Sequence, residues 1–279
     1  MRIFSTKGSK LFEITEEQFP LEKEIQRLTE ANLPEIFELD FVRSEFELQG
    51  LRIDTVALDR ESKAFVIIEY KRERNFSVVD QGMAYLNLML NNKSDFILEY
   101  NESFSSPPRS LKREDVDWSQ SRVIFIAPEF TKYQQHAIGF KDVGIQLWEL
   151  HKYNNGLLIF NEVKSPSTKE PVTTVIKNNA VAKKVTDEIK VYTEEDHLKL
   201  VDDKIKEIYS ELKAGIIGLG NDIEVRPKKH YVAFRRNQAF ASVIFLRAKL
   251  KVYLNIQINE LDDYSKKARD VKYMRLGHN

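Results

Sequence analysis

Cysteine is absent from all 279 residues of the chain. This absence excludes a disulfide framework and any Cys-ligated metal site, and it favours a reducing intracellular compartment. No apolar run approaches the ~20 residues that are needed to span a bilayer. The first residues, MRIFSTKGSK, also lack the apolar core of roughly 7–15 residues that a secretory signal requires. We therefore expect a cytoplasmic protein that does not enter a membrane.

Other catalytic signatures are missing as well. The five histidines include no pair at i, i+4 and no metal-ligand spacing, so a His-based zinc site is not expected. The chain contains no Gly-x-Ser-x-Gly and, without cysteine, no thiol nucleophile. The segment GIIGLGN (215–221) lacks the P-loop lysine and does not follow a strand, so it is typical of a helix end and turn.

The charge balance hides an asymmetry. The chain is 42% hydrophobic and 31% charged with zero net charge, which is typical of a soluble globular protein. Residues 1–165 contain 21 Lys and Arg against 27 Asp and Glu, whereas residues 166–279 contain 22 against 16. An acidic half joined to a basic half indicates a charged partner, and overall neutrality does not exclude nucleic acid.

A change of composition divides the chain. Residues 161–190 hold two of the eight prolines, several Ser and Thr, and little periodic apolar pattern before Val185. This is linker composition. We predict a first domain over 1–165, a linker over 166–185 and an accessory α+β domain over 186–279.

Hydrophobic periodicity predicts the elements of both domains. The first domain should hold helices over 21–32, 78–92 and about 130–138, with strands over 39–48, 51–59, 64–71, 122–128, 145–153 and 156–163. The first three strands form an antiparallel meander, and NNG joins the last two as a hairpin. The expected fold is a mixed α/β sheet flanked by helices. The second domain should contain a helix over 194–213 and about three strands.

The strand VIIEYKRE (66–73) carries charge where burial is expected. Both of its faces are apolar, so it should be central, with Glu69 and Lys71 projecting together at its end. An antiparallel partner would bring Asp54 close to Glu69. Two neighbouring carboxylates repel unless a cation or proton intervenes, and Mg²⁺ bound by carboxylates would relieve this repulsion. Lys71 could hold a nucleophilic water or neutralise charge. The plainer alternative is a strand end with solvated charges.

These segments resemble the PD-(D/E)XK nuclease superfamily. Its pattern is a helix that carries an acidic residue, then a strand with Asp, a strand with Glu-x-Lys and a helix that often carries Gln. RIDTVALD, VIIEYKRE and VVDQGMAYL match that pattern in order and spacing, over about residues 15–165. The branch that they most resemble is the RecB-like and archaeal mismatch-endonuclease type. Unlike the family pattern, no Pro precedes Asp54. The resemblance implies a restriction-endonuclease-like fold and Mg²⁺-dependent hydrolysis of DNA, with Mn²⁺ as a substitute.

The resemblance also implies a role for each matching residue. Asp54 and Glu69 would be metal ligands, with the Tyr70 carbonyl as a third. Lys71 would orient or activate water, and Gln81 would support the site from its helix. The first-helix acid would be Glu22, with Glu24 as the alternative. The second half resembles a small uncharacterised domain, which we expect to be truncated after DVKYMRLGHN. We expect the protein to assemble as a homodimer. The alternative function is a catalytically inactive nuclease-fold module that binds nucleic acid or a partner protein.

A basic segment of the second half is a candidate nucleic-acid surface. RPKKHYVAFRR (226–236) packs five basic residues around two aromatic ones. Phosphates would attract the cations, and an aromatic ring could stack on bases. The alternative is a strand with solvated charges and core aromatics. The residues expected to contact nucleic acid are Arg226, Lys228, Lys229, Tyr231, Arg235 and Arg236.

Overall fold

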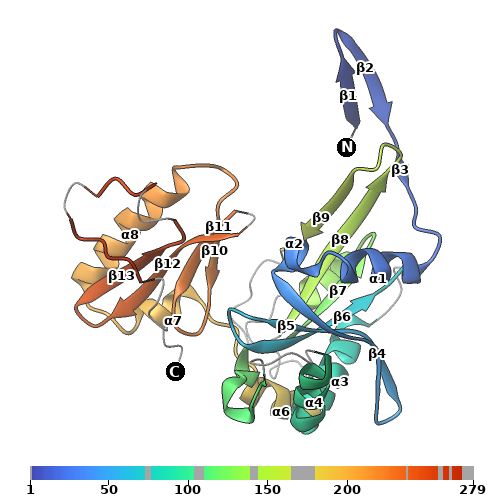
Figure 1. Ribbon diagram of the computed structural model, residues 1–279, viewed down its shortest axis with the longest axis horizontal. Helices are drawn as coiled ribbons and strands as arrows, with labels where there is room; N and C mark the ends of the chain where they lie inside the picture. The colour runs from blue at the N-terminus through green and yellow to red at the C-terminus, as the bar shows by residue number, and fades with distance from the viewer. Residues whose placement is uncertain are drawn as a thin grey trace. The chain divides into compact units, whose positions relative to one another are not determined.

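The chain folds into two compact units, Met1–Val191 and Tyr192–Asn279 (Figure 1). A computed structural model describes residues 2–72, 77–103, 110–138, 144–164, 180–236, 238–256, 260–263 and 266–271. The division falls after Val191 rather than within 166–185, because helix α6 (Ala180–Glu188) packs against helix α3 of the first unit. Residues 166–179 of the predicted linker lie outside the described residues.

The described part of the first unit is built on a seven-stranded mixed sheet. Its strand order is β3-β8-β7-β6-β5-β4, with β9 paired to β8. Pairing is parallel between β6, β7 and β8 and antiparallel elsewhere. The strands are β3 (Glu16–Glu17), β4 (Leu39–Leu48), β5 (Leu51–Asp59), β6 (Ala64–Tyr70), β7 (Arg122–Ala127), β8 (Ile145–Tyr153) and β9 (Leu158–Glu162).

Strand β6 lies at the centre of this sheet, and each of its residues is buried. Its two apolar faces belong to two different cores, because Phe65 and Ile67 face one side while Val66 and Ile68 face the other. A strand covered on both faces reads as a continuous apolar run. The predicted fold class, a mixed sheet flanked by helices with an antiparallel meander over β4, β5 and β6, is therefore confirmed.

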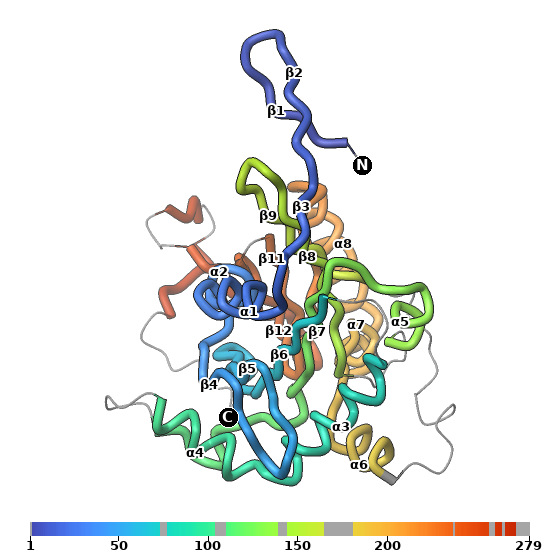
Figure 2. The backbone as a smooth tube through the Cα atoms, turned by 90° about the vertical axis from the view of Figure 1, so that its right-hand side faces the viewer, coloured from blue at the N-terminus to red at the C-terminus, as the bar shows by residue number. Residues whose placement is uncertain are grey.

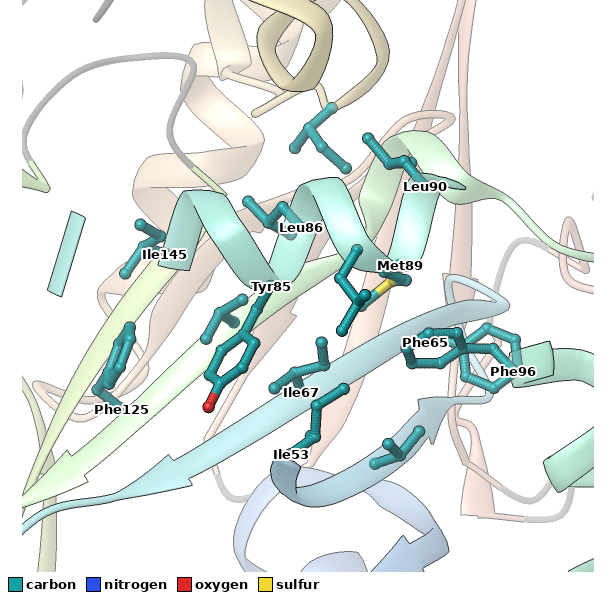
Figure 3. Close-up of a cluster of buried hydrophobic side chains, with 14 of the residues drawn as sticks. Ile53, Phe65, Ile67, Tyr85, Leu86, Met89, Leu90, Phe96, Phe125 and Ile145 are labelled. Atoms are coloured by element: carbon teal, nitrogen blue, oxygen red, sulfur yellow. The ribbon is translucent and has the colours of Figure 1, made fainter. Parts of the chain in front are cut away.

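Helices cover both faces of the sheet (Figures 1 and 2). Helices α1 (Glu22–Glu30) and α2 (Leu33–Phe37) supply apolar side chains to one core, together with Phe19. Helices α3 (Val78–Asn91), α4 (Lys93–Ser103) and α6 supply the other core. Figure 3 shows Tyr85 and Met89 of α3 pointing toward Ile67 of β6.

Helix α3 is fixed close to the sheet at its first turn. The side chain of Ser77 caps it by accepting a hydrogen bond from the Asp80 backbone N–H. At Gly82, an added Cβ would lie 2.4 Å from Cδ1 of Ile145 on β8. A larger residue at position 82 would therefore require the Ile145 side chain to move.

Several predicted boundaries change in the first unit. The helix expected over 21–32 is α1, which ends at Glu30, and the short helix α2, with Pro34 in its first turn, follows it and was not predicted. Helix α4 was not predicted, and the helix expected at 130–138 is α5 (Lys132–Ala137). Two short 3₁₀ turns, Arg113–Asp115 and Trp118–Gln120, precede β7.

A separate two-stranded sheet precedes β3. Strands β1 (Ile3–Lys7) and β2 (Lys10–Ile14) pair antiparallel around Gly8, whose φ is +61°. A positive φ of this kind suits a two-residue hairpin turn. The sequence analysis did not anticipate this hairpin.

The second unit is a four-stranded antiparallel sheet in the order β10-β11-β12-β13, with helices packed on one core. The helix predicted over 194–213 is broken in two, because the Asp202 side chain accepts a hydrogen bond from the Ile205 N–H and starts a new helix. The elements are α7 (Glu194–Leu198), α8 (Asp203–Ile217), β10 (Glu224–Pro227), β11 (Val232–Arg235), β12 (Ala239–Leu246) and β13 (Lys249–Leu254).

Candidate functional site

Two carboxylates meet where β5 leaves β6. The pairing of these strands ends at Thr55 and Ile68, so Asp54 and Glu69 come next in register. Asp54 Oδ2 accepts a hydrogen bond of 3.1 Å from the Tyr70 backbone N–H. The structure thus brings together the two acids that the sequence analysis expected to be close.

Glu69 presents its two oxygens to different surroundings. Its residue is 3% exposed. Oε1 accepts hydrogen bonds from Lys71 Nζ at 2.7 Å and from Gln81 Nε2 at 2.8 Å. Oε2 is buried without a hydrogen-bond partner among the described residues. Burying a carboxylate oxygen without a hydrogen-bond donor costs free energy. A cation bound to Oε2 would offset this cost.

Burial and charge change the pKa values of Asp54 and of the Tyr85 phenol near it. Burial, and next the negative charge of Glu69, raise the pKa of Asp54 to about 6. Burial, followed by the same Glu69 charge, raises the pKa of the Tyr85 phenol above its usual value. Burial and the nearby Glu69 charge thus both favour the protonated forms of Asp54 and Tyr85.

Lys71 lies directly beyond the end of β6. Its backbone N–H donates to the Ile126 carbonyl of β7 at 2.8 Å, which continues the strand pairing by one residue. Its side chain is 22% exposed and turns back to Glu69. The ammonium group therefore lies between the buried carboxylate and solvent.

Gln81 joins the site from the first turn of α3, as the sequence analysis expected. Its Nε2 contacts the Tyr85 hydroxyl at 3.1 Å as well as Glu69. The Tyr85 hydroxyl in turn donates to the Arg52 carbonyl of β5 at 3.2 Å. This chain of contacts links the helix to both acid strands.

The Tyr70 side chain points to the opposite face of the sheet. Its hydroxyl lies 3.1 Å from Thr55 Oγ1, which donates to Glu30 of α1 at 2.7 Å. Burial raises the pKa of this phenol strongly. The phenol therefore takes no part in the acid pair, and a metal bond from the Tyr70 carbonyl stays a prediction.

The predicted first-helix acids lie apart from the pair. Glu22 is exposed and its Oε1 accepts a hydrogen bond of 2.8 Å from the Arg72 N–H, so it holds the chain beyond Lys71. Glu24 is also exposed. Among the described residues, no three His, Cys, Asp or Glu side chains are grouped closely enough to hold a metal ion. Neither glutamate therefore supplies a third acid to Asp54 and Glu69.

Two residues that the sequence analysis missed support the site. Gln26 of α1 is 3% exposed, and its Nε2 donates to the Asp54 carbonyl at 2.8 Å. Glu45 of β4 lies opposite Asp54 in register and forms ion pairs with Lys23 and Arg52. The two-residue turn at Gln49 and Gly50 fixes that register, so the sequence did contain a signal for Glu45.

The basic segment of the second unit differs from its predicted role. Tyr231 is 5% exposed and Phe234 is 0% exposed, so neither ring is available to stack on bases. The stacking prediction for Tyr231 is therefore wrong, because every residue from Tyr231 to Phe234 is buried. Arg226 pairs with Glu224 at 2.8 Å and Arg236 with Asp222 at 3.2 Å. Lys228, Lys229 and Arg235 remain predicted nucleic-acid contacts.

The residues at the end of β6 fit a hard divalent cation. Such a cation takes oxygen ligands, and Mg²⁺ commonly uses one or two protein carboxylates with water and substrate phosphate completing its shell. Asp54 and Glu69 provide two carboxylates, and Glu69 Oε2 is buried without a donor. A third acid is not required for this kind of site.

A cavity of about 330 Å³ lies away from the acid pair. Its lining includes Leu58, Arg60 and Lys63, around the turn that joins β5 to β6. Because this turn is at the other end of both strands from Asp54 and Glu69, the cavity plays no part in the chemistry considered below.

The fold and site define a mixed α/β protein in which a buried and a partly buried carboxylate lie with a lysine and a glutamine at the end of the central strand. The chain belongs to the same family as an uncharacterized protein of Haemophilus influenzae, to which it is 44% identical over 278 residues, covering 100% of this chain and 90% of the relative. Residues 194–278 match a family model described as a domain of unknown function (DUF5655). This match agrees with the predicted resemblance of the second half to an uncharacterised domain.

Solved structures are similar over part of the chain. A repair endonuclease from Pyrococcus abyssi is 18% identical with a TM-score of 0.29, over 49% of each chain. EndoMS in apo form is 17% identical with a TM-score of 0.31, over 50% of this chain and 49% of that one. In the described part of the chain, no helix combines the length and apolarity needed to cross a membrane.

Proposed function

We propose that the protein is a Mg²⁺-dependent nuclease that hydrolyses phosphodiester bonds of DNA, with Mn²⁺ as a substitute. The observation that carries this proposal is the environment of Glu69, whose Oε1 takes two donors while Oε2 is buried without one. Lys71 and Gln81 hold the carboxylate through Oε1, and Oε2 stays without a donor on a residue that follows the last paired position of β5 and β6, next to Asp54 in register. This arrangement suits cation binding better than it suits a structural ion pair, which would use both oxygens.

Asp54 and Glu69 would hold the metal, with the Tyr70 carbonyl as a further oxygen ligand. The bound cation would supply Lewis-acid stabilisation of a phosphate oxygen and lower the pKa of water at the site. Asp54 is positioned for this role by the Tyr70 N–H on its carboxylate and by Gln26 on its backbone carbonyl. Because these bonds leave the second carboxylate oxygen of Asp54 available, both acids would offer one oxygen to the same ion.

Lys71 would act on the nucleophile and on developing charge. Its ammonium lies 2.7 Å from Glu69 Oε1 and reaches solvent with 22% of its side chain exposed. An ammonium group at that point would hold an attacking water near the carboxylates, or it would stabilise the negative charge that develops on the phosphate. Gln81 would act as a positioning residue, because it contacts Glu69 and not the reacting atoms.

Titration calorimetry with Mn²⁺ and Mg²⁺ tests the metal site. We expect the wild-type chain to bind Mn²⁺, and Asp54→Asn and Glu69→Gln to lose that binding while remaining folded by circular dichroism. Glu24→Gln is the matched control, since Glu24 is an exposed acid on α1 outside the pair. The titrations are then repeated in the presence of a short DNA duplex and Ca²⁺. This repeat detects metal binding that requires phosphate oxygens of the substrate as ligands.

Cleavage assays then test the reaction. Duplex DNA, single-stranded DNA and RNA are each incubated with Mg²⁺ and with EDTA. We expect DNA fragments only with Mg²⁺, and none from Asp54→Asn or Lys71→Met. Metal binding without cleavage of any substrate would contradict the enzyme and support the inactive nucleic-acid-binding module instead.

A further inference from the structure

The β1–β2 hairpin has no structural partner in the described part of the chain. It is a two-stranded sheet of its own and pairs with no strand of the main sheet. Both views show it extending beyond the end of the first unit (Figures 1 and 2). A two-stranded hairpin alone in water is marginally stable. A contact with a ligand would stabilise such a ribbon.

The tip of the hairpin concentrates positive charge. Lys7 and Lys10 are cross-strand partners, both are exposed, and neither has a carboxylate partner among the described residues. Like charges directly opposite each other on a ribbon destabilise it. An anion placed between the two ammonium groups would remove this repulsion.

This charge contrasts with the rest of the domain. Residues 1–165 hold 21 basic against 27 acidic side chains. On the hairpin, the acidic Glu13 is already bonded to Arg2 at 2.9 Å, near the base. The two lysines thus lie at the tip of an arm that extends from an acidic domain, which fits a polyanion approached by the arm first.

The dimensions of the ribbon fit a double helix. Paired strands lie about 4.8 Å apart, and five residues extend about 16 Å. The major groove of DNA, about 12 Å wide, admits a two-stranded ribbon. Phe12 is 50% exposed and lies on the same face as the two lysines by strand register. An exposed aromatic ring on a groove-facing ribbon can contact thymine methyl groups.

We propose that the β1–β2 hairpin is a DNA-binding arm whose tip enters the major groove, with Lys7 and Lys10 bound to phosphates. The proposal rests on the proposed function and adds a contact surface separate from the carboxylate pair. It predicts that binding and cleavage can be impaired independently.

Fluorescence anisotropy with a duplex of about 20 base pairs tests the arm in EDTA, where no cleavage occurs. The probe is titrated over a series of salt concentrations with the full chain and with the double variant Lys7→Gln and Lys10→Gln. Each lost phosphate contact lowers the slope of log affinity against log salt by about 0.9. We expect the slope to fall by about 2 and the affinity to fall roughly tenfold or more at about 0.1 M salt. Lys63→Gln with Lys112→Gln is the matched control, since both lysines are exposed near the β5–β6 turn.

An unchanged slope and affinity in the hairpin variant would overturn the proposal. A wild-type dimer in sedimentation that becomes a monomer in Phe12→Ser, with the slope unchanged, would also overturn it and identify a second copy as the occupant. Two variants distinguish failure of the DNA-binding arm from failure of the proposed nuclease function. Asp54→Asn should keep the salt slope of the wild type, and the hairpin variant should keep Mn²⁺ binding.

Discussion

Asp54 accepts a hydrogen bond from the backbone N–H of Tyr70, 3.1 Å away, at the point where β5 and β6 stop pairing. A side-chain carboxylate thus takes the place of the strand carbonyl that a continued ladder would supply. This substitution holds Asp54 beside Glu69 without a third acid. The position of the site therefore follows from where two strands separate.

Replacement of Asp54 by Asn should change how stability depends on pH. In the folded protein the pKa of Asp54 is about 6 against an ordinary 3.8, so its proton is held more tightly than in the unfolded chain. The stabilisation that protonated Asp54 gives the folded state is therefore complete below about pH 4. It is lost as pH rises through 6, which lowers the free energy of unfolding by up to about 3 kcal/mol. Asp54→Asn keeps the acceptor for Tyr70 and should not show this loss. Urea unfolding in EDTA from pH 4 to 8 measures it.

Added Mn²⁺ should reverse that pattern for the wild-type chain. Because a cation offsets the charge that appears above pH 6, the stabilisation by Mn²⁺ should be larger at pH 7.5 than at pH 5. Glu24→Gln should follow the wild type at each pH. A wild-type and an Asp54→Asn profile that run parallel in EDTA would contradict the raised pKa of Asp54.

Gln81→Leu should weaken metal binding while leaving the fold intact. Gln81 donates to Glu69 Oε1 at 2.8 Å, and loss of a residue that orients a metal ligand commonly costs about 10–100-fold in affinity. Asn87→Ala on the same helix is the control, since the Asn87 side chain accepts a hydrogen bond from Asn91 in the last turn of α3 rather than contacting Glu69. Mn²⁺ calorimetry should therefore separate the two variants, and equal affinities would mean that Lys71 alone orients Glu69.

The sequence contained enough information to place Asp54 against Glu69. A four-residue turn joins two strands whose apolar alternation is regular, so their register follows from counting residues. Gln26 could not be found in this way, because its contact depends on the angle at which α1 packs on the sheet. The register set by the Gln49–Gly50 turn could have placed Glu45 opposite Asp54. However, the φ of Glu45 is +54°, which is not the backbone conformation of a regular strand and does not follow from the sequence pattern.

The failures in the second unit have a similar cause. A continuous apolar stripe predicted one helix over 194–213, whereas Asp202 caps a new helix within that range. Local capping competes with periodicity, and periodicity alone does not show which one prevails. Tyr231 was interpreted as a surface ring because of its basic neighbours, although the residue is only 5% exposed.

Gly82→Ala should destabilise the first unit, whereas Gly215→Ala should not. A methyl at Gly82 would lie 2.4 Å from Ile145 Cδ1 and 2.9 Å from Ile145 Cγ1, inside a packed core. Overpacking of this kind costs about 1–3 kcal/mol. Gly215 lies in α8 with nothing within 4 Å, so alanine there should stabilise by roughly 0.5–1 kcal/mol. Chemical denaturation of both variants checks the opposite signs, and Ile145→Ala should relieve part of the Gly82→Ala loss.

Helix α6 should prove essential to the first unit, although it follows the proline-containing segment. Val185 and Ile189 are 0% and 1% exposed in the core that α3 also builds. A large-to-small replacement such as Ile189→Ala should cost roughly 2–5 kcal/mol of stability. Val181→Ala is the control, since Val181 lies on α6 but is 40% exposed. Thermal unfolding that shifts equally in the two variants would contradict the placement of α6 in this core.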